Sequence, residues 1–168
     1  GGLDLKLKVG DVVLADHVLK INTDPTDVDT YPINIKQLAL LEELSFPKKI
    51  EIYRGKLITV DQVVCDSTAK QELGSRYNAM AVDMETAMLV AYANDKNIII
   101  LSVRAISDTA KQSLVDVSSF VGNDGEVSKL KAGWYAMTHP NTIKNFISLR
   151  GQSRLASRNM TEFLGFFM

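Results

Sequence analysis

Two apolar segments of this chain each lead into carboxylates, and a helical stretch separates them. The first is Ala81–Ala87 (AVDMETA), and the second leads into Arg104–Asp108 (RAISD). In an open α/β sheet, ligands bind just beyond the carboxyl ends of strands. We therefore expect an α/β fold in which Glu85 and Asp108 converge on one crevice.

Composition places loose limits on what the chain can be. Its 168 residues are 46% apolar and 23% charged, which is typical of one soluble globular domain with a sizeable core. A net charge of −1 gives no indication of a nucleic-acid partner. No apolar run reaches the roughly 18 residues of a membrane span, and no secretory signal is visible. The lone Cys65 excludes an intrachain disulfide and favours a reducing, cytoplasmic compartment.

The front half of the chain shows mixed strand and helix patterns. Turn residues and apolar spacing indicate these elements. We predict a strand within 9–16 after a Gly turn, a helix over 34–44, a strand pair or bent strand over 51–60 around Gly55, and a short helix from Ser67 that ends at Gly74.

The next part reads as strand, helix and strand. Residues 79–82 and 84–94 have the patterns of a short strand and of a helix rich in Ala, Met and Leu. Residues 97–103 form a nearly continuous apolar run, which suits a central strand covered on both faces. Together they predict a right-handed βαβ unit.

The last part of the chain changes character. A loop is predicted over 111–117, and residues 127–168 read as a helical tail of the same single domain, 1–168. His139-Pro140 stops one helix and starts the next, with Pro140 in its first turn. Gly151 is expected to interrupt that helix before a last amphipathic helix over 154–167. The sheet's outer face is the expected partner of this tail.

The two carboxylate motifs resemble the purine nucleoside phosphorylase and nucleosidase superfamily. In that family a Met-Glu pair holds the ribose and a Ser-Asp pair addresses the purine. The resemblance implies a three-layer α/β/α fold with a central mixed sheet. A similar Gly-rich turn and "vGDvv" strand follow an initial strand, helix and strand in the family, whereas this chain matches from Gly1 onward. We therefore expect the first strand-helix segment to be missing here.

The resemblance gives the first motif a role in binding the sugar. Glu85 would accept charge-assisted hydrogen bonds from the ribose hydroxyls. The plainer alternative is a first-turn carboxylate favoured by the helix dipole. Met84 would pack on the sugar, or simply fill the core. Asp83 stands where the family usually has Glu, and we expect it to act behind the residues that touch substrate.

The second motif would activate the base. Asp108 would protonate or hydrogen-bond the departing purine near N7, with a pKa raised by burial, and Ser107 would support it. An Asx turn or helix cap is the alternative for this pair. Arg104 would orient the nucleophile and the protein carboxylate that binds the ribose. The alternative for Arg104 is a strand-end salt bridge with Asp83, Glu85 or Asp108.

Two further segments match parts of the family that surround the base. Val63 and Val64 follow Thr59-Val60-Asp61-Gln62, but many members carry an aromatic where Val63 stands, and at least one valine is expected to be strand core. Gly1 and Gly2 match a turn near the base. Their N–H groups would form an anion nest, or the glycines would only serve a tight turn.

One branch of the family fits the whole length. "TVD" at 59–61, the two motifs, Asn123-Asp124-Gly125 and His139-Pro140 resemble hopanoid-associated phosphorylases, which act on an adenosyl-carrying hopane lipid and release adenine.

The resemblance implies cleavage of the N-glycosidic bond of a purine (adenine) nucleoside or 5′-substituted adenosine by phosphate or water. It implies no cofactor or metal, phosphate as a possible co-substrate, and a homo-oligomer, a dimer first. We expect these residues alone to be nearly inactive. The alternatives are a non-catalytic nucleoside-binding module and a structural subunit.

Overall fold

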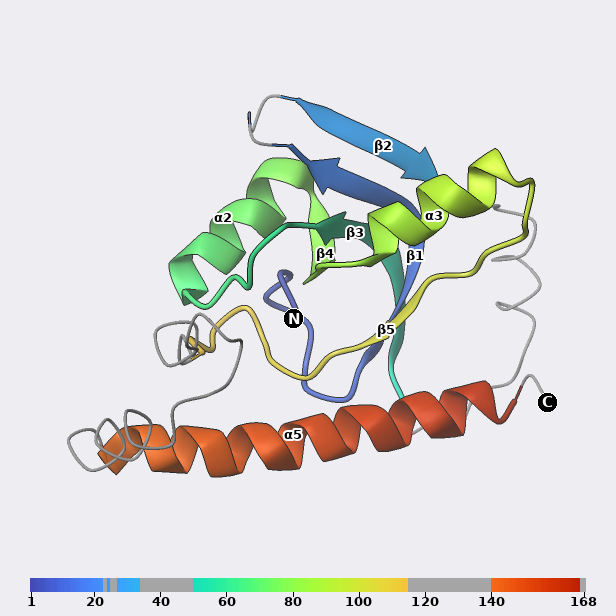
Figure 1. Cartoon of the computed structure of the whole chain (residues 1–168). Coiled ribbons are helices and arrows are strands. Elements are labelled where there is room, and N and C mark those ends of the chain that lie inside the picture. The colour runs from blue at the N-terminus through green and yellow to red at the C-terminus, as the bar shows by residue number, and fades with distance from the viewer. Residues whose placement is uncertain (23, 25–26, 34–49, 115–139, 167–168) are drawn as a thin grey trace, which may run out of the picture.

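A mixed five-stranded sheet flanked by helices forms the body of the molecule (Figure 1). The computed structural model describes residues 1–22, 24, 27–33, 50–114 and 140–166. None of the helices in these ranges combines the length and apolar character needed to cross a membrane. The expected α/β fold with a central mixed sheet is confirmed. The predicted helix over 34–44, the Asn123-Asp124-Gly125 turn and the start of the helical tail, 127–139, lie outside the described residues.

β1 (Val12–Ile21) is the central strand of the sheet. One edge pairs in parallel with β3 (Ile52–Thr59), which pairs in parallel with β4 (Ala79–Asp83). The other edge pairs with two antiparallel strands, β2 (Val28–Pro32) beside its second half and β5 (Val103–Ala105) beside its first residues. The predicted strand over 51–60 is one strand, with an irregular register opposite β4 at Lys56.

The segment 97–103 is not the buried central strand that its apolar run predicts. Ile98 and Ile99 are 53% and 73% exposed, and only Val103–Ala105 forms a strand. That strand runs antiparallel to β1, so the expected parallel βαβ unit does not form. The strand at 103–105 is short because β2 already pairs with the rest of this edge of β1.

α2 (Ser67–Tyr77) runs past the predicted end at Gly74. The Asp66 carboxylate caps its start by accepting the N–H groups of Thr68 and Ala69, each at 2.9 Å. Asn78 ends it in a left-handed conformation at φ 49°, which Asn tolerates better than most residues. Gly74 serves another purpose: a Cβ there would lie 2.8 Å from the Leu3 carbonyl oxygen, so only glycine allows this close approach.

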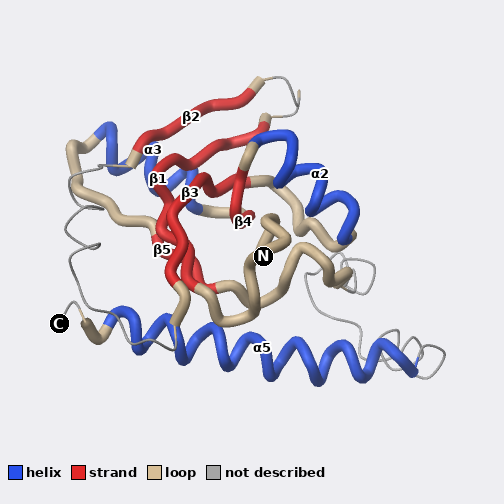
Figure 2. Tube along the Cα trace, turned by 180° about the vertical axis from the view of Figure 1, so that it is seen from behind, coloured by secondary structure: helices blue, strands red, loops and turns tan. Residues whose placement is uncertain are grey.

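α3 (Thr86–Asp95) follows β4 after two residues, and α5 (Pro140–Leu164) ends the described chain. Pro140 is the first residue of α5, as predicted, but Gly151 does not interrupt the helix. One glycine destabilises a helix by about 1 kcal/mol relative to alanine, which the tertiary packing of the helix can offset. Near its end α5 buries Phe163, and Asn159 donates to the Gly10 carbonyl oxygen at 2.8 Å. These contacts hold α5 along the end of the sheet where β1 begins (Figure 2).

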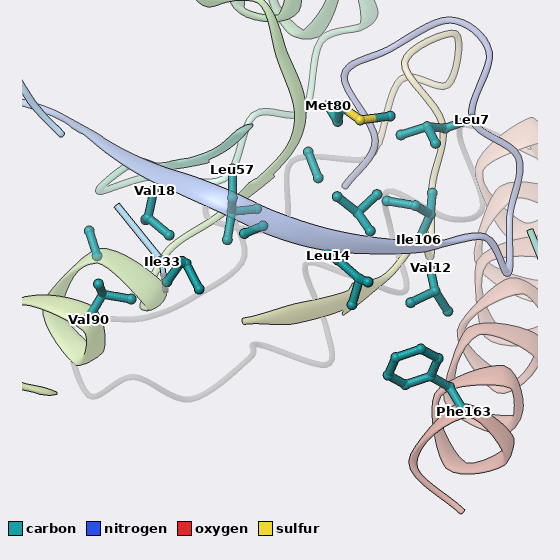
Figure 3. Close-up of a cluster of buried hydrophobic side chains, with 14 of the residues drawn as sticks. Leu7, Val12, Leu14, Val18, Ile33, Leu57, Met80, Val90, Ile106 and Phe163 are labelled. Carbon is teal, nitrogen blue, oxygen red and sulfur yellow. The ribbon is translucent and has the colours of Figure 1, made fainter. Parts of the chain in front are cut away.

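Alternating side chains place apolar cores on both faces of the central strands. Val18 and Leu57 face the larger cluster, with Val90 of α3 and Phe163 of α5 (Figure 3). Their neighbours Leu19 and Ile58 face a smaller cluster, against which Leu73 and Tyr77 of α2 pack. Helices therefore cover both faces of the sheet.

Candidate active site

A cavity of about 280 Å³ lies beside the end of β4. This volume is near the lower end of the roughly 300–1,000 Å³ typical of small-molecule sites. Nine of the ten residues that the sequence singled out line it, the tenth being Gly2. They are Gly1, Val63, Val64, Asp83, Met84, Glu85, Arg104, Ser107 and Asp108. The expected convergence of Glu85 and Asp108 is therefore correct, although its expected cause, two parallel strand ends, is not.

Three polar side chains form the buried end of the cavity: Lys70, Ser107 and Asp108. The Lys70 ammonium donates to Asp108 Oδ2 at 2.6 Å, and the two side chains are only 1% and 6% exposed. Lys70 also donates to the Gln112 carbonyl oxygen at 2.9 Å. The Ser107 hydroxyl donates to Asp108 Oδ1 at 2.8 Å. Both carboxylate oxygens of Asp108 thus have a donor from the protein.

These donors determine the charge of Asp108. Burial by itself would raise the pKa of Asp108, but the donors around the carboxylate, Lys70 and the Ser107 hydroxyl among them, outweigh it. The pKa of Asp108 therefore lies below its ordinary value, and the expectation of a raised pKa is wrong. At neutral pH this end of the cavity presents a carboxylate that accepts hydrogen bonds.

Three other side chains form the open end of the cavity: Asp83, Glu85 and Arg104. Arg104 donates to the Asp83 carboxylate and, at 3.2 Å, to Glu85 Oε2. The pairing with Asp83 and Glu85 matches two of the three salt bridges considered from the sequence, and no ion pair joins Arg104 to Asp108 within the described ranges. Burial lowers the pKa of Arg104, yet a guanidinium stays charged at any ordinary pH.

Asp83 and Glu85 have different surroundings although they stand two residues apart. Asp83 is 6% exposed and accepts from the Thr59 hydroxyl at 2.7 Å and from the Thr86 hydroxyl. Its carboxylate also accepts the Thr86 N–H at the start of α3. Glu85 is 68% exposed and caps nothing with its side chain. The helix-start role considered for Glu85 therefore belongs to Asp83, and Glu85 remains available to a ligand.

The N-terminal glycines do not form an anion nest. The Gly1 amine donates to the Val82 carbonyl oxygen at 2.9 Å, and the Gly2 N–H donates to the Asp108 carbonyl oxygen at 2.7 Å. Gly2 is buried behind the cavity and pairs with Ala81 as a β-bridge. At Gly1 a Cβ would lie 2.5 Å from Asp108 Oδ2, so glycine is required for the chain to pass this carboxylate.

The remaining predicted residues lie at the mouth of the cavity. Val63 and Met84 are 59% and 41% exposed, whereas Val64 packs against the smaller core cluster. Val64 thus contacts the core as expected, but from the loop after β3 and not from a strand. Within the described part of the chain, no three His, Cys, Asp or Glu side chains gather as a metal ion would need.

Sequence reasoning missed Lys70. Its helix is short and polar, which is typical of a solvated element, and nothing in its neighbours indicates that this lysine turns inward. The one indication lies in Asp108, because a buried carboxylate needs a cation nearby, and Lys70 of α2 is that cation.

Comparisons with known proteins identify similar sequences and folds. The family described as the phosphorylase superfamily matches residues 1–132. A 5′-methylthioadenosine/S-adenosylhomocysteine nucleosidase of Mycobacterium bovis is 28% identical over 156 residues, which cover 73% of this chain and 61% of that protein. An aminodeoxyfutalosine nucleosidase of Campylobacter jejuni is 25% identical over 142 residues, with 76% and 61% covered. The chain thus spans about 61% of the length of these curated relatives.

Solved structures show the same fold. The 5′-methylthioadenosine/S-adenosylhomocysteine nucleosidase from Neisseria meningitidis, in complex with methylthio-immucillin-A, superposes with a TM-score of 0.62 at 19% identity. The match covers 99% of this chain and 64% of that one. Because the family match extends over most of its length, this chain belongs to the phosphorylase superfamily.

Proposed function

We propose that this chain carries the base and ribose sites of an enzyme that cleaves the N-glycosidic bond of a purine nucleoside. The observation that carries the proposal is one cavity with a buried carboxylate at one end and an exposed carboxylate, held by an arginine, at the other. The relatives named above, which are nucleosidases, support the same reaction class.

The purine occupies the buried end. Ile106 and Ala81 are buried apolar residues that line the cavity beside Asp108 and provide surface for a flat ring. Asp108 accepts hydrogen bonds from ring or exocyclic N–H groups, which adenine offers. This placement leaves the sugar at the open end.

The ribose hydroxyls donate to Glu85, and Met84 packs against the sugar. Cleavage breaks the bond from C1′ to the base, and the bonding electrons leave with the base. Positive charge develops on the sugar, where the carboxylate of Glu85 stabilises it. Arg104 holds Glu85 in place and faces the side from which water or phosphate attacks. Substituents at C5′ lie toward the cavity mouth, near the exposed Val63, which leaves room for the lipid-bearing adenosine of the hopanoid-associated branch.

Calorimetric titration of this chain tests the site directly. We expect adenine and adenosine to bind, uridine to bind far more weakly, and Asp108→Leu to abolish adenine binding. Glu72→Gln, on the exposed face of α2, is the matched control and should change nothing.

Turnover is tested by adenine release from adenosine and 5′-methylthioadenosine, with and without phosphate. The assay uses this chain and, where the gene encodes more residues, the full gene product. Dependence on phosphate distinguishes phosphorolysis from hydrolysis. Purine binding with no release by either protein would select a nucleoside-binding module instead. Absence of both would refute the proposal.

A further inference from the structure

We propose that Thr59 is a positioning residue for the open end of the cavity. Its hydroxyl orients the carboxylate of Asp83, and Asp83 in turn holds the guanidinium that faces Glu85. The inference rests on the proposed function, in which Glu85 binds the ribose. Thr59 is 2% exposed and is not one of the residues that line the cavity, so it acts only through its neighbours.

Strand pairing places Thr59 beside Asp83. Thr59 is the last residue of β3 and Asp83 the last residue of β4, and the two are partners in the parallel register. The Val60 N–H donates to the Asp83 carbonyl oxygen at 2.9 Å and holds the two strand ends together. Because side chains alternate along a strand, partners in register lie on the same face of the sheet. The Thr59 hydroxyl therefore meets the Asp83 carboxylate where α3 begins.

The hydrogen bonds of Thr59 have a fixed direction. The Ala87 N–H of α3 donates to the Thr59 hydroxyl oxygen at 3.0 Å, and a backbone N–H can only donate. The hydroxyl proton is therefore directed to Asp83 Oδ1, which accepts it at 2.7 Å. Valine at this position would have the same shape but would take this partner away from both the Ala87 N–H and the Asp83 carboxylate.

The two oxygens of Asp83 have different partners. Oδ1 accepts from the Thr59 hydroxyl, whereas Oδ2 accepts from the Thr86 hydroxyl and from Arg104 Nη2. The Thr86 N–H lies 3.4 Å from Oδ1 and 3.3 Å from Oδ2. While Thr59 holds Oδ1, the carboxylate cannot turn freely, and Oδ2 stays directed at Arg104. Arg104 Nη2 also donates to Glu85 Oε2 at 3.2 Å, and through this contact it orients the exposed Glu85 side chain.

The effect of Thr59 concerns the sugar and not the base. A carboxylate that is already oriented loses less conformational freedom when it binds a hydroxyl, so Thr59 strengthens the preference of the site for a ribose. The contacts of Thr59 are with Asp83 and Ala87, whereas the base lies at the buried end. Loss of the Thr59 hydroxyl should therefore weaken recognition of the 2′-hydroxyl and leave adenine binding unchanged.

The first test compares the dissociation constants of adenosine, 2′-deoxyadenosine and adenine for variants of this chain. We expect Thr59→Val to lower the preference for adenosine over 2′-deoxyadenosine by about two- to tenfold, the usual effect of one hydrogen bond. Thr59→Ser keeps the hydroxyl and should retain the preference of the parent chain. Phe163→Leu loosens the core at α5, away from the cavity, and is the control for lost stability. An unchanged preference in Thr59→Val, or an equal loss of adenine affinity, would overturn the proposal.

A double-mutant cycle tests whether Thr59 acts through Glu85. If it does, Thr59→Val should lower the sugar preference of the parent chain but not that of Glu85→Gln, because the double variant has no carboxylate left to orient. Additive losses in the double variant would show that the two residues contribute independently, which contradicts the route from Thr59 to Glu85.

The last test needs no ligand and follows the ¹⁵N relaxation of the Arg104 Nε–H group. This nitrogen is buried, so its proton is shielded from exchange with water, and the signal that disappears in Arg104→Lys identifies it. We expect a rigid Nε–H on the ps–ns timescale in the parent chain and in Thr59→Ser, and a more mobile one in Thr59→Val.

The relaxation measurement keeps the two proposals apart. A mobile Arg104 in the parent chain would overturn the role of Thr59 even if Thr59→Val does not fold, and so would an equally rigid Arg104 in a folded Thr59→Val. If neither nucleoside binds, the proposed function fails, whereas the relaxation of Arg104 still decides whether Thr59 positions the open end.

Discussion

Each end of the cavity pairs a cationic side chain with a carboxylate, but the two pairs differ in exposure to solvent. At the buried end, Lys70 and Asp108 are 1% and 6% exposed; at the open end, Arg104 and Glu85 are 36% and 68% exposed. An exposed ion pair contributes about 0–1 kcal/mol, whereas removing one partner of a buried pair costs about 3–5 kcal/mol. The ion pair at the buried end thus keeps Asp108 charged, whereas the ion pair at the open end only orients Glu85.

Asp83 shows how the open end keeps its geometry without being buried throughout. Its carboxylate accepts a hydrogen bond from Arg104 and is itself held by the hydroxyls of Thr59 and Thr86. Glu85 can therefore stay exposed and still meet an oriented guanidinium. If this comparison is correct, substitutions at the two ends should differ in kind as well as in size.

The largest effect is expected from Asp108→Asn, which keeps the shape of the side chain but removes its charge. We expect kcat for adenine release by the full gene product to fall by about 10²–10³-fold, the usual effect of removing one preorganised electrostatic contact to the transition state. Affinity for adenosine should fall less than affinity for adenine, because N7 of adenosine carries no proton and only its exocyclic N–H groups can donate to Asp108. A variant with the turnover of the parent would show that the buried carboxylate is only structural.

Stability should reveal the same difference between the ends. Lys70→Met leaves Asp108 buried without its cation, and we expect the free energy of unfolding to fall by about 3 kcal/mol. The double variant Lys70→Met/Asp108→Leu removes both charges and should recover most of that loss. Urea denaturation measures both. Equal losses for the single and double variants would mean that packing, and not the ion pair, holds this end together.

Much of the site could be predicted from the sequence because short motifs carry it. Asp83, Met84 and Glu85 follow a strand directly, and Ser107 and Asp108 follow another, so local order already groups them. Lys70 could not be predicted, because its inward direction depends on α2 packing beside the segment after β5. The charge of Asp108 was misjudged for the same reason, since burial was considered without the cation.

The fold shows a similar limit. The apolar run over 97–103 has the composition of a buried strand, and nothing local reveals that β2 occupies most of the β1 edge. α5 likewise continues through Gly151, and it makes its tertiary contacts further on, at Asn159 and Phe163. Local patterns therefore predicted element types well, whereas strand partners and helix ends depended on tertiary contacts.

A smaller effect is expected in the pH dependence of stability. The folded pKa of Asp108 lies below its unfolded value, so the group stabilises the fold above the unfolded pKa of about 3.9, and this stabilisation is lost as pH falls through the folded pKa. Between pH 6 and 3 the parent chain should lose more stability than Asp108→Asn. Taking the difference between the two proteins removes the contribution of Asp11, whose pKa burial raises. Parallel pH profiles of unfolding free energy would contradict the lowered pKa.

The smallest effect is expected at the open end, in Glu85→Gln. Glu85 is exposed and its side chain caps no helix, so the free energy of unfolding should change by less than about 1 kcal/mol. Specificity should change instead. The neutral amide accepts a weaker hydrogen bond from the ribose 2′-hydroxyl than the carboxylate does, by about 1 kcal/mol. The ratio of kcat/KM for adenosine to that for 2′-deoxyadenosine should therefore fall by about fivefold, while Glu72→Gln keeps the parent ratio. An unchanged ratio in Glu85→Gln would show that the exposed carboxylate does not contact the sugar, and that only the buried end of this cavity recognises its ligand.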